Sequence, residues 1–373
     1  MVLFGLAMLT HCGAPPERST ASVASPPTAP VTLACRPRPP STIGLGVAHV
    51  AGTYAVRHQA SESFLQAGAL RARELGARTL KLFLTPEFRT KYPQAWPEGI
   101  GSLAALADSQ AFRDVFDQPF DTFVLTTYSF SMGSGDPWRG REVDGLLSAE
   151  AQELDELVTL LSTRYAGSGK TFVLQTWEGD WALFGNYDPS TIAPADRIER
   201  MSKWLSSRHQ AIAVARDREA RPGVAIADAI EVNRVLDVGV GPRVISAVVP
   251  NACADLISYS AWEALEGASA DVLETRLTTA LATIRQFAPA GSAVMLGELG
   301  FAENENEVAP AAELIERTLA VAKKNDVRGA VYWQIFDNEC SAQNGCRGFW
   351  VMRPDGSLSG AGQSLSAHWA NGS

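Results

Sequence analysis

The sequence predicts an α/β fold, a closed (β/α)₈ TIM barrel, and three observations support this prediction. The chain has 373 residues, of which 46% are hydrophobic and 20% are charged, so it can bury a large core. From residue 42 onward, short β-rich apolar runs alternate with longer segments of helical period. Eight such runs start about 40 residues apart, which leaves room for a helix and two loops between strands. We therefore expect residues 42–373 to form one domain.

The eight strands follow from their apolar runs, taken in chain order. They are expected at residues 43–50, 79–85, 122–128, 171–176, 224–232, 256–260, 293–299 and 329–335. Parallel strands joined by helices wind right-handedly, and closing eight of them into a barrel leaves no exposed edge. In such a barrel the chemistry belongs at the C-terminal ends of the strands.

Helices are expected in most of the intervals between these strands. Their predicted ranges are 61–76, 102–116, 149–164, 194–220, 270–287 and 309–325. Ser148 is in position to cap the third helix, and Gly76 is in position to end the first in a left-handed conformation. Residues 236–253 have the least helical pattern, so we expect an irregular or short crossover there.

The first 12 residues are similar to a secretion signal. The apolar run at residues 2–9 is too short to span a bilayer. Residues 9–12 resemble a bacterial lipoprotein cleavage box, which implies lipidation of Cys12. Two features depart from that pattern, because His11 stands where a small residue is expected and no Lys or Arg precedes the apolar run. An ordinary apolar terminus is the alternative.

Residues 13–41 are expected to form an extended linker. They contain eight of the 21 prolines, interleaved with Ser, Thr and Ala, and cannot build a periodic apolar face. A linker between an export signal and a folded domain indicates an extracytoplasmic protein, secreted or anchored to the bacterial cell envelope. A membrane tether would then run through lipidated Cys12.

The cysteines agree with an oxidising compartment. Cys340 and Cys346 lie six positions apart in a polar loop, where we expect a short disulfide. Their spacing fits no zinc pattern. Cys35 and Cys253 are either a second pair or free thiols.

Charge and motifs exclude several classes of partner. The net charge of −9 argues against nucleic acid or an anionic membrane surface as a ligand, and favours a neutral or polar small substrate. The sequence has no Gly-x-Ser-x-Gly elbow, and its five histidines form neither His-x-His nor His-Glu-x-x-His. We therefore expect no metal and no cofactor, and a monomeric protein.

Two carboxylates stand out at predicted strand ends. Glu178 follows the fourth strand between Trp177 and Gly179, and Glu298 ends the seventh strand in Gly-Glu-Leu-Gly. A carboxyl group in such apolar surroundings has a raised pKa unless hydrogen bonds or a cation compensate, and two of them indicate acid–base chemistry. Asp180 and Glu263 remain rivals of Glu178 for this role.

This placement resembles the clan of retaining glycoside hydrolases built on (β/α)₈ barrels. In that clan a Glu at the end of strand four is the acid/base, and a Glu at the end of strand seven is the nucleophile. The resemblance implies that Glu178 is the acid/base and Glu298 the nucleophile. It also implies that Trp333 is the aromatic platform after strand eight, and that Tyr259 contacts the nucleophile.

The sequence departs from the clan at two places. Trp177 stands where the clan usually has Asn before the acid/base, so a hydrogen bond to a sugar 2-hydroxyl would come from Asn233 or Asp180. The clan often places an Arg at the end of strand two, and residues 82–85 contain none.

Aromatic side chains gather near the predicted strand ends. Six of the nine tryptophans lie there or in the loops that follow: Trp96, Trp138, Trp177, Trp181, Trp262 and Trp333. Flat apolar rings at such a site stack on sugars, although Trp96 and Trp138 could equally pack under long loops. The residues expected to bind a carbohydrate substrate are Trp177, Asp180, Trp181, Asn233, Tyr259, Trp262, Trp333 and Asp337.

The sequence thus predicts an exported retaining glycoside hydrolase that cleaves O-glycosidic bonds of a poly- or oligosaccharide with two glutamates. A non-catalytic barrel that binds glycan through the same cleft is the alternative, and the two departures above motivate it. A barrel without any ligand is a third interpretation.

Overall fold

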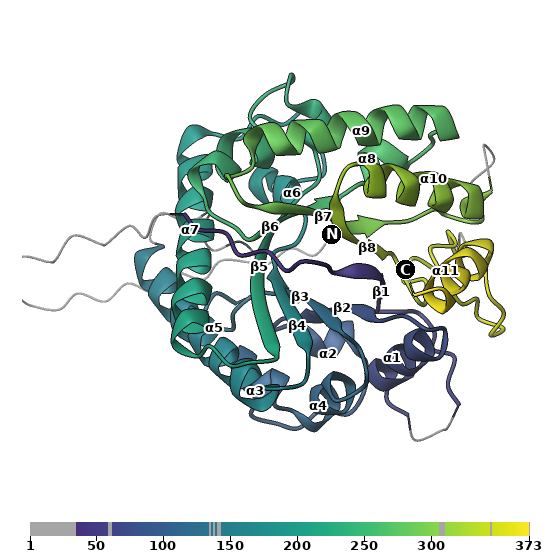
Figure 1. Cartoon of the computed structure of the whole chain (residues 1–373), viewed down its shortest axis with the longest axis horizontal. Coiled ribbons are helices and arrows are strands. Elements are labelled where there is room, and N and C mark those ends of the chain that lie inside the picture. The colour runs from purple at the N-terminus through teal and green to yellow at the C-terminus, as the bar shows by residue number, and fades with distance from the viewer. Residues whose placement is uncertain are drawn as a thin grey trace, which may run out of the picture. The chain divides into compact units, whose positions relative to one another are not determined.

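The computed structural model confirms the closed barrel. It describes residues 35–372 except 59–61, 134–135, 137–138, 140–142, 306–309 and 344. Eight parallel strands pair in chain order from β1 to β8, and β8 pairs again with β1. Figure 1 shows this ring of strands surrounded by helices.

The strands agree with their predicted ranges to within a few residues. They are β1 (Gly44–Ala48), β2 (Thr79–Leu84), β3 (Thr122–Thr127), β4 (Lys170–Gln175), β5 (Val224–Val232), β6 (Leu256–Ser260), β7 (Ala293–Leu299) and β8 (Val327–Tyr332). The register between β6 and β7 shifts after Tyr259, so that Ser260 lies opposite Glu298. This shift brings a hydroxyl group beside a carboxyl group at the end of the barrel.

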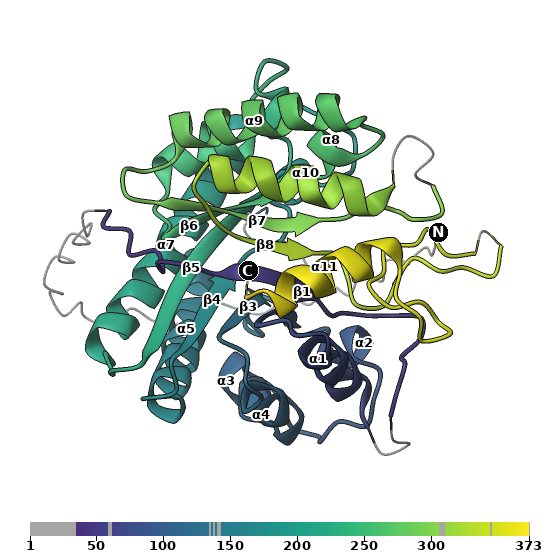
Figure 2. The ribbon, with the colours of Figure 1, turned by 45° about the vertical axis from the view of Figure 1, so that its right-hand side comes forward.

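The six predicted helical intervals are all helical, with different boundaries in places. The helices are α1 (Phe64–Glu74), α2 (Phe88–Lys91), α3 (Leu103–Ala107), α4 (Gln110–Phe116), α5 (Asp144–Arg164), α6 (Gly179–Phe184), α7 (Ala195–Arg218), α8 (Trp262–Leu265), α9 (Ala270–Phe287), α10 (Ala311–Lys324) and α11 (Gly360–Ala370). Figure 2 shows α9 and α10 over β7 and β8.

Two predicted helix boundaries have different outcomes. Gly76 has φ +95°, so its left-handed conformation after α1 is confirmed. Ser148 was expected to be a cap, which is wrong, because α5 begins four residues earlier at Asp144 and Ser148 lies inside the helix. The crossover before β6 is irregular as predicted: a 3₁₀ turn (Val235–Asp237), a π turn (Val244–Val248) and a second 3₁₀ turn (Val249–Asn251).

Packing between strands and helices explains why these segments fold together. All six residues of β2 and all six of β3 are buried. On the outer face, Phe123 of β3 and Phe172 of β4 stack with ring centroids 5.5 Å apart, and Phe116 of α4 lies edge-on to both. Burying each such ring contributes about 1.5–3 kcal/mol, so this layer fixes the helices against the barrel.

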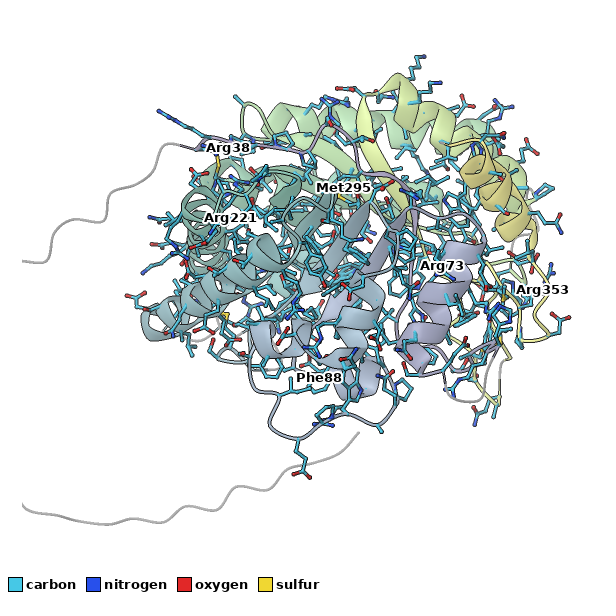
Figure 3. The ribbon with its side chains drawn as sticks, turned by 60° about the horizontal axis from the view of Figure 1, so that its bottom comes forward. Arg38, Arg73, Phe88, Arg221, Met295 and Arg353 are labelled. Carbon is cyan, nitrogen blue, oxygen red and sulfur yellow. A yellow bond between two sulfur atoms is a disulfide. The ribbon has the colours of Figure 1, made fainter. Side chains whose placement is uncertain are left out.

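Both cysteine pairs form disulfides. Cys340–Cys346 is confirmed, and Cys35 pairs with Cys253, which decides the alternative that the sequence left open. The second disulfide ties the end of the predicted linker to the segment before β6, and the backbone N–H of Arg38 donates to Asp255 there. In Figure 3 Arg38 and Arg221 lie at the opposite side of the ribbon from Arg353. Cys12 and the rest of residues 1–34 lie outside the described residues.

Among the helices of the described residues, none combines the length and the apolar composition that crossing a bilayer requires.

Candidate active site

A cavity of about 650 Å³ opens at the C-terminal ends of the strands. Glu178 and Glu298 both line it, although they come from strands on different sides of the barrel. Each is more than nine-tenths buried. The structure therefore brings the two predicted carboxyl groups into one pocket.

Glu298 accepts hydrogen bonds at both of its oxygens. Its Oε1 accepts from Lys81 Nζ at 2.8 Å. Its Oε2 lies 3.2 Å from Trp262 Nε1 and 3.2 Å from Ser260 Oγ. An indole N–H and an ammonium can only donate, so both Glu298 oxygens act as acceptors and the carboxylate forms an ion pair with Lys81.

Glu178 has a different environment. It precedes α6 with φ +24°, a backbone conformation that non-glycine residues seldom adopt. Its carboxyl group has one hydrogen-bond partner among the described residues, Ser260 Oγ, 2.9 Å from Oε1. Burial raises the pKa of Glu178 well above its usual range, and the charges of Glu298 and Glu231 raise it further. This environment favours the protonated form.

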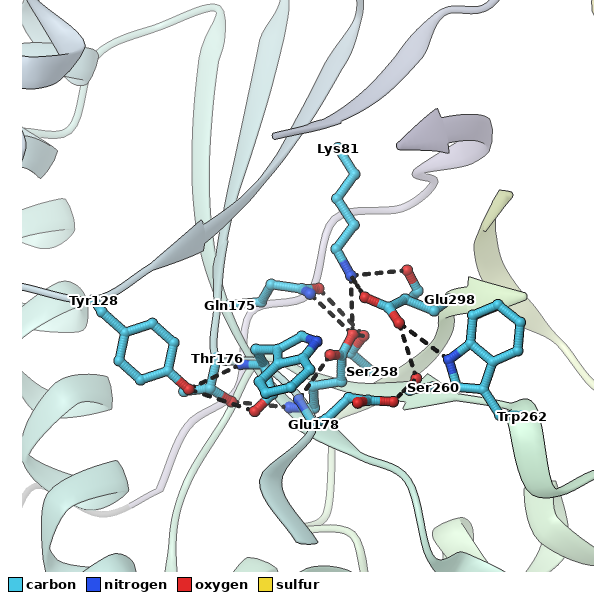
Figure 4. A network of polar contacts seen from close by, with 12 residues as sticks. Lys81, Tyr128, Gln175, Thr176, Glu178, Ser258, Ser260, Trp262 and Glu298 are labelled. Atoms are coloured by element: carbon cyan, nitrogen blue, oxygen red, sulfur yellow. Dashed lines mark hydrogen bonds and ion pairs between the residues drawn. The ribbon is translucent and has the colours of Figure 1, made fainter. Parts of the chain in front are cut away.

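Ser260 joins the two carboxyl groups, as Figure 4 shows. Its hydroxyl group carries one proton and can donate to only one of them. With Glu178 protonated, the Glu178 O–H donates to Ser260 Oγ, and the Ser260 O–H donates to Glu298. The hydrogen-bond chain thus satisfies all three groups with the proton on Glu178 and the charge on Glu298, the arrangement that the Lys81 ion pair with Glu298 favours.

Two further charged residues complete the network, and the sequence analysis missed both. Lys81 of β2 is fully buried, and its ammonium group donates to Glu298 Oε1, Glu231 Oε1 and the carbonyl oxygen of Gly297. Burial works to lower the pKa of Lys81, but the charges of Glu231 and Glu298 outweigh it and raise that pKa. The positive charge missing from residues 82–85 is therefore supplied one position earlier.

Glu231 of β5 is a buried carboxyl group that shares Lys81 with Glu298. Burial raises its pKa, while the positive charge of Lys81 lowers it. A signal for both missed residues was present in the sequence, because Lys81 and Glu231 are charged positions inside otherwise apolar strand runs. Such residues are almost never buried without a partner.

The aromatic predictions separate into two groups. Trp177, Trp181, Trp262 and Trp333 line the cavity, together with Tyr128 and Tyr187, which the sequence analysis did not single out. Trp96 does not line it and instead packs edge-on against Phe88 at 4.9 Å. Trp138 lies outside the described residues.

The predicted polar binding residues lie behind the cavity wall. Asp180 and Asn233 are buried and bond to each other's backbone: the Asp180 N–H donates to Asn233 Oδ1 at 2.9 Å, and the Asn233 N–H donates to Asp180 Oδ2 at 3.1 Å. Asp337 is fully buried and accepts from the N–H groups of Glu339 and Gly348. None of these three is among the described residues that line the cavity.

Tyr259 and Glu263 form a separate buried pair. The Tyr259 hydroxyl donates to Glu263 Oε1 at 3.1 Å, so the contacts to Glu298 come from Ser260 and Trp262 instead. Burial raises the pKa of Glu263 to about 7. Glu263 is not among the described cavity-lining residues, whereas its rival Glu178 is.

Comparisons with known proteins support the architecture. No protein-family model and no curated protein matches the sequence. Among solved structures, a GH5_18 protein from Bifidobacterium longum subsp. infantis gives a TM-score of 0.59 at 15% identity, over 88% of this chain and 79% of the other. A GH5_18 variant from Streptomyces cattleya in complex with Manb1-4GlcNAc gives 0.57 at 17% identity, over 88% and 80%.

A third match is a family 5 xyloglucanase from Paenibacillus pabuli in complex with ligand. Its TM-score is 0.52 at 12% identity, over 89% of this chain and 99% of the other. At these identities the similarity concerns the path of the backbone rather than the sequence. The described chain thus shares the (β/α)₈-barrel fold of these solved structures.

Proposed function

We propose that the protein is a retaining glycoside hydrolase that acts on a poly- or oligosaccharide. The observation that carries this proposal is the pair Glu178 and Glu298, which share Ser260 across one cavity while their environments favour opposite protonation states. A protonated and an ionised carboxyl group facing one pocket are what the double-displacement reaction needs.

The proposed reaction has two steps. Glu298 attacks the anomeric carbon and the glycosidic C–O bond breaks, while Glu178 transfers its proton to the leaving oxygen. This step gives a glycosyl ester on Glu298 and an ionised Glu178. Glu178 then takes a proton from water, the hydroxide oxygen bonds to the anomeric carbon, and the ester bond breaks. Two inversions leave the configuration unchanged.

The spacing of the carboxyl groups supports retention. Ser260 Oγ lies 2.9 Å from Glu178 Oε1 and 3.2 Å from Glu298 Oε2, so these two oxygens lie within roughly 6 Å of each other, closer than the spacing of about 6.5–9.5 Å in inverting glycosidases. A water molecule placed for direct attack would need the wider gap. The geometry therefore favours a nucleophile over a second base.

The aromatic side chains of the cavity support a sugar ligand. Trp262 donates to Glu298 and lines the cavity with Trp333, so we assign these two rings to the sugar that is attacked. Trp177 and Trp181 flank Glu178 in sequence, and we assign them to the leaving group. Asp180 and Asn233 are assigned to holding α6 against β5, because each bonds to the other's backbone.

Hydrolysis of a substrate panel tests the proposal. The panel contains aryl glycosides and plant and microbial glycans, with β-mannosides included because two GH5_18 neighbours were solved with Manb1-4GlcNAc. The wild type should cleave at least one member with retention, detected by ¹H NMR of the first product anomer. Glu178→Gln and Glu298→Gln should abolish cleavage, whereas Glu263→Gln, the matched buried control, should keep it.

A non-catalytic glycan-binding barrel is the second candidate, because Trp177 stands where an Asn is expected before the acid/base. Glycan binding by the wild type, without turnover of any panel member, would favour this candidate over the hydrolase. Absence of both binding and turnover would contradict both candidates.

We also propose that the protein is exported and tethered through a lipid on Cys12, and that it acts as a monomer. The two disulfides support an oxidising compartment. Detergent phase partitioning of the expressed full chain tests the tether: the wild type should enter the detergent phase, and Cys12→Ala should stay in the aqueous phase. Size-exclusion chromatography of the Cys12→Ala protein tests the monomer.

A further inference from the structure

We propose that Glu231 is a positioning residue that holds Glu178 and Glu298 in register and keeps the proton on Glu178. This inference rests on the proposed hydrolase function and extends it to a residue that touches neither sugar nor leaving group. Glu231 lies on β5, between the strands that carry the other two glutamates. It is fully buried, accepts a hydrogen bond from the Glu178 backbone and shares the Lys81 ammonium with Glu298.

Four groups donate to the Glu231 carboxylate. Its Oε1 accepts from Lys81 Nζ at 3.2 Å, Gln175 Nε2 at 2.9 Å and Ser258 Oγ at 3.2 Å. Its Oε2 accepts from the backbone N–H of Glu178 at 2.9 Å. Three of these groups, the Lys81 ammonium, the Gln175 amide and the Glu178 N–H, can only donate, whereas the Ser258 hydroxyl also lies 3.2 Å from Gln175 Oε1. The donor set therefore favours an ionised Glu231, although burial raises its pKa.

These contacts connect Glu231 to both ends of the proposed reaction. Through Oε2 it holds the Glu178 backbone at its unusual φ of +24°. Through Oε1 it shares the Lys81 ammonium with Glu298. The contact between Lys81 and Glu298 is drawn as a dashed line in Figure 4. One rigid carboxylate thus fixes the distance and the charge balance between the acid and the nucleophile.

The glycine before Glu298 is explained by the same residue. A Cβ atom at Gly297 would lie 1.8 Å from Ser258 Oγ and 2.6 Å from Glu231 Oε1. No side chain fits there, because the Glu231 carboxylate and its Ser258 partner occupy the space. Glu231 therefore explains why a glycine precedes Glu298 in β7.

The charge of Glu231 also acts on the proton at Glu178. Two negative charges raise the pKa of Glu178 in addition to burial, those of Glu298 and Glu231. Removing the Glu231 charge therefore lowers the pKa of Glu178, so that Glu178 loses its acidic proton at a lower pH. A purely structural residue would change stability without moving this pKa.

The test compares Glu231→Gln with Glu150→Gln. Glu150 is a matched control, since it is buried and accepts from Trp204 Nε1 and Arg208 Nη1 on the outside of the barrel. A Gln at 231 offers one acceptor oxygen where the site has four donors, so it loses either the Glu178 or the Lys81 side. The measurement is kcat/KM against pH, for aryl glycosides with good and with poor leaving groups.

We expect the alkaline limb of the Glu231→Gln profile to move to lower pH. We also expect kcat/KM to fall by about 10²-fold for poor leaving groups, since a misplaced acid assists them less, and far less for dinitrophenyl leaving groups, which need no proton. Glu150→Gln should shift neither. An unmoved limb, with equal losses for both leaving groups, would overturn the proposal.

Glu231→Asp keeps the inference testable if Glu231→Gln does not fold. It retains the charge but is one methylene shorter, so we expect the leaving-group-dependent loss without the shift of the alkaline limb. Equal losses for both leaving groups would again refute the role. If the wild type cleaves glycosides while Glu231 variants behave like the control, only this inference fails. A wild type without glycosidase activity would remove the proposed function itself.

Discussion

β5 carries two buried carboxylates on opposite faces, and their surroundings differ in kind. Asp228 points outward to His209 of α7, with His209 Nδ1 2.9 Å from Asp228 Oδ1. Glu231, three residues later, points into the barrel toward Lys81 and the cavity end. The same strand therefore contributes to two charged clusters. We call the one toward the helices the outer cluster and the one toward the proposed active site the inner cluster.

In the outer cluster most polar groups are hydrogen-bonded or ion-paired to other residues of the cluster. Asp255, which precedes β6, accepts from the Arg38 N–H at 2.6 Å, from Arg216 Nη1 at 2.5 Å and from the Asp228 N–H at 3.1 Å. The Asp255 N–H donates back to Asp228. None of these residues is among those described as lining the cavity. This arrangement ties the segment before β1, α7, β5 and β6 together.

In the inner cluster only some of the charged groups have all their hydrogen-bond partners within the protein. Lys81 and Glu231 are saturated with partners, whereas the Glu178 carboxyl group has a single hydrogen-bond partner among the described residues and faces the cavity. In the outer cluster the saturated charges serve stability, whereas in the inner cluster they position Glu178, the group with few partners that is available for proton transfer. Substitutions in the two clusters should therefore have opposite signatures.

The largest expected effect is on activity, in the inner cluster. Glu298→Gln should lower kcat/KM by at least about 10⁴-fold, because the amide cannot form the glycosyl ester. Its free energy of unfolding should change by less than about 2 kcal/mol, since Glu231 still pairs with Lys81. Kinetics and urea unfolding of the same preparation measure both. A loss of unfolding free energy as large as the free-energy equivalent of the fall in kcat/KM would contradict the proposed difference between the two clusters.

Next in size is the disulfide beside the outer cluster. Cys35 and Cys253 are 218 residues apart, so replacing both with Ser should destabilise the protein by up to about 5 kcal/mol through the entropy of the unfolded chain. Activity per folded molecule should not change, because the bond is remote from the cavity. Urea unfolding and kinetics at low temperature separate the two.

The disulfide at the cavity rim provides the matched comparison. Cys340 and Cys346 close a loop with a separation of six residues, so their removal should cost only about 2 kcal/mol. Because Asn338 and Glu339 line the cavity just before this loop, KM should rise. Equal stability losses for the two disulfides, with KM unchanged in both, would contradict the comparison.

Asp255→Asn should cost about 3–5 kcal/mol of unfolding free energy, because it leaves the largely buried Arg216 guanidinium without its counter-ion. Its kcat/KM should stay within about twofold of wild type. Glu274→Gln is the control, since the Arg317–Glu274 pair is 47% and 40% exposed and is worth less than about 1 kcal/mol. A large activity loss in Asp255→Asn would show that the outer cluster also shapes the site.

The sequence predicted the inner cluster only in part, and the reason is physical. Strand runs are local patterns, so all eight strands and the positions of Glu178 and Glu298 could be predicted from them. Lys81 gains its role from carboxylates 150 and 217 positions away in the chain, and Glu231 from partners 27 to 150 positions away. The sequence around either residue contains no local pattern that identifies those partners.

The polar binding residues show the same limit. Asp180 and Asn233 were expected to replace the missing Asn before Glu178, but the sequence does not determine which way either side chain turns after its strand end. The neighbouring N–H groups of Asn233, Arg234 and Val244 all donate to Asp180. Which backbone N–H groups need a side-chain acceptor becomes clear only once the turn geometry is known.

The smallest expected effect is a pH dependence of stability in the outer cluster. Burial alone lowers the pKa of His209, but the hydrogen bond and charge of Asp228 outweigh it and raise that pKa. A raised pKa means that protonated His209 stabilises the folded state fully below about pH 6.5, and that this contribution is lost as the pH rises through the higher folded-state value. The loss should appear in unfolding free energies measured across the neutral to alkaline range.

His209→Gln should remove this contribution. Its cost should be about 1.5 kcal/mol at pH 6, the value of a hydrogen bond to a charged group, and should shrink as the pH rises. His368→Gln, whose partner Glu316 is half exposed, should stay within about 1 kcal/mol of wild type throughout. Since His209 is remote from the cavity, the alkaline limb of kcat/KM should not move in His209→Gln. A shared shift of stability and activity would mean that one titration governs both faces of β5, and the two clusters would then have to be treated as a single electrostatic unit.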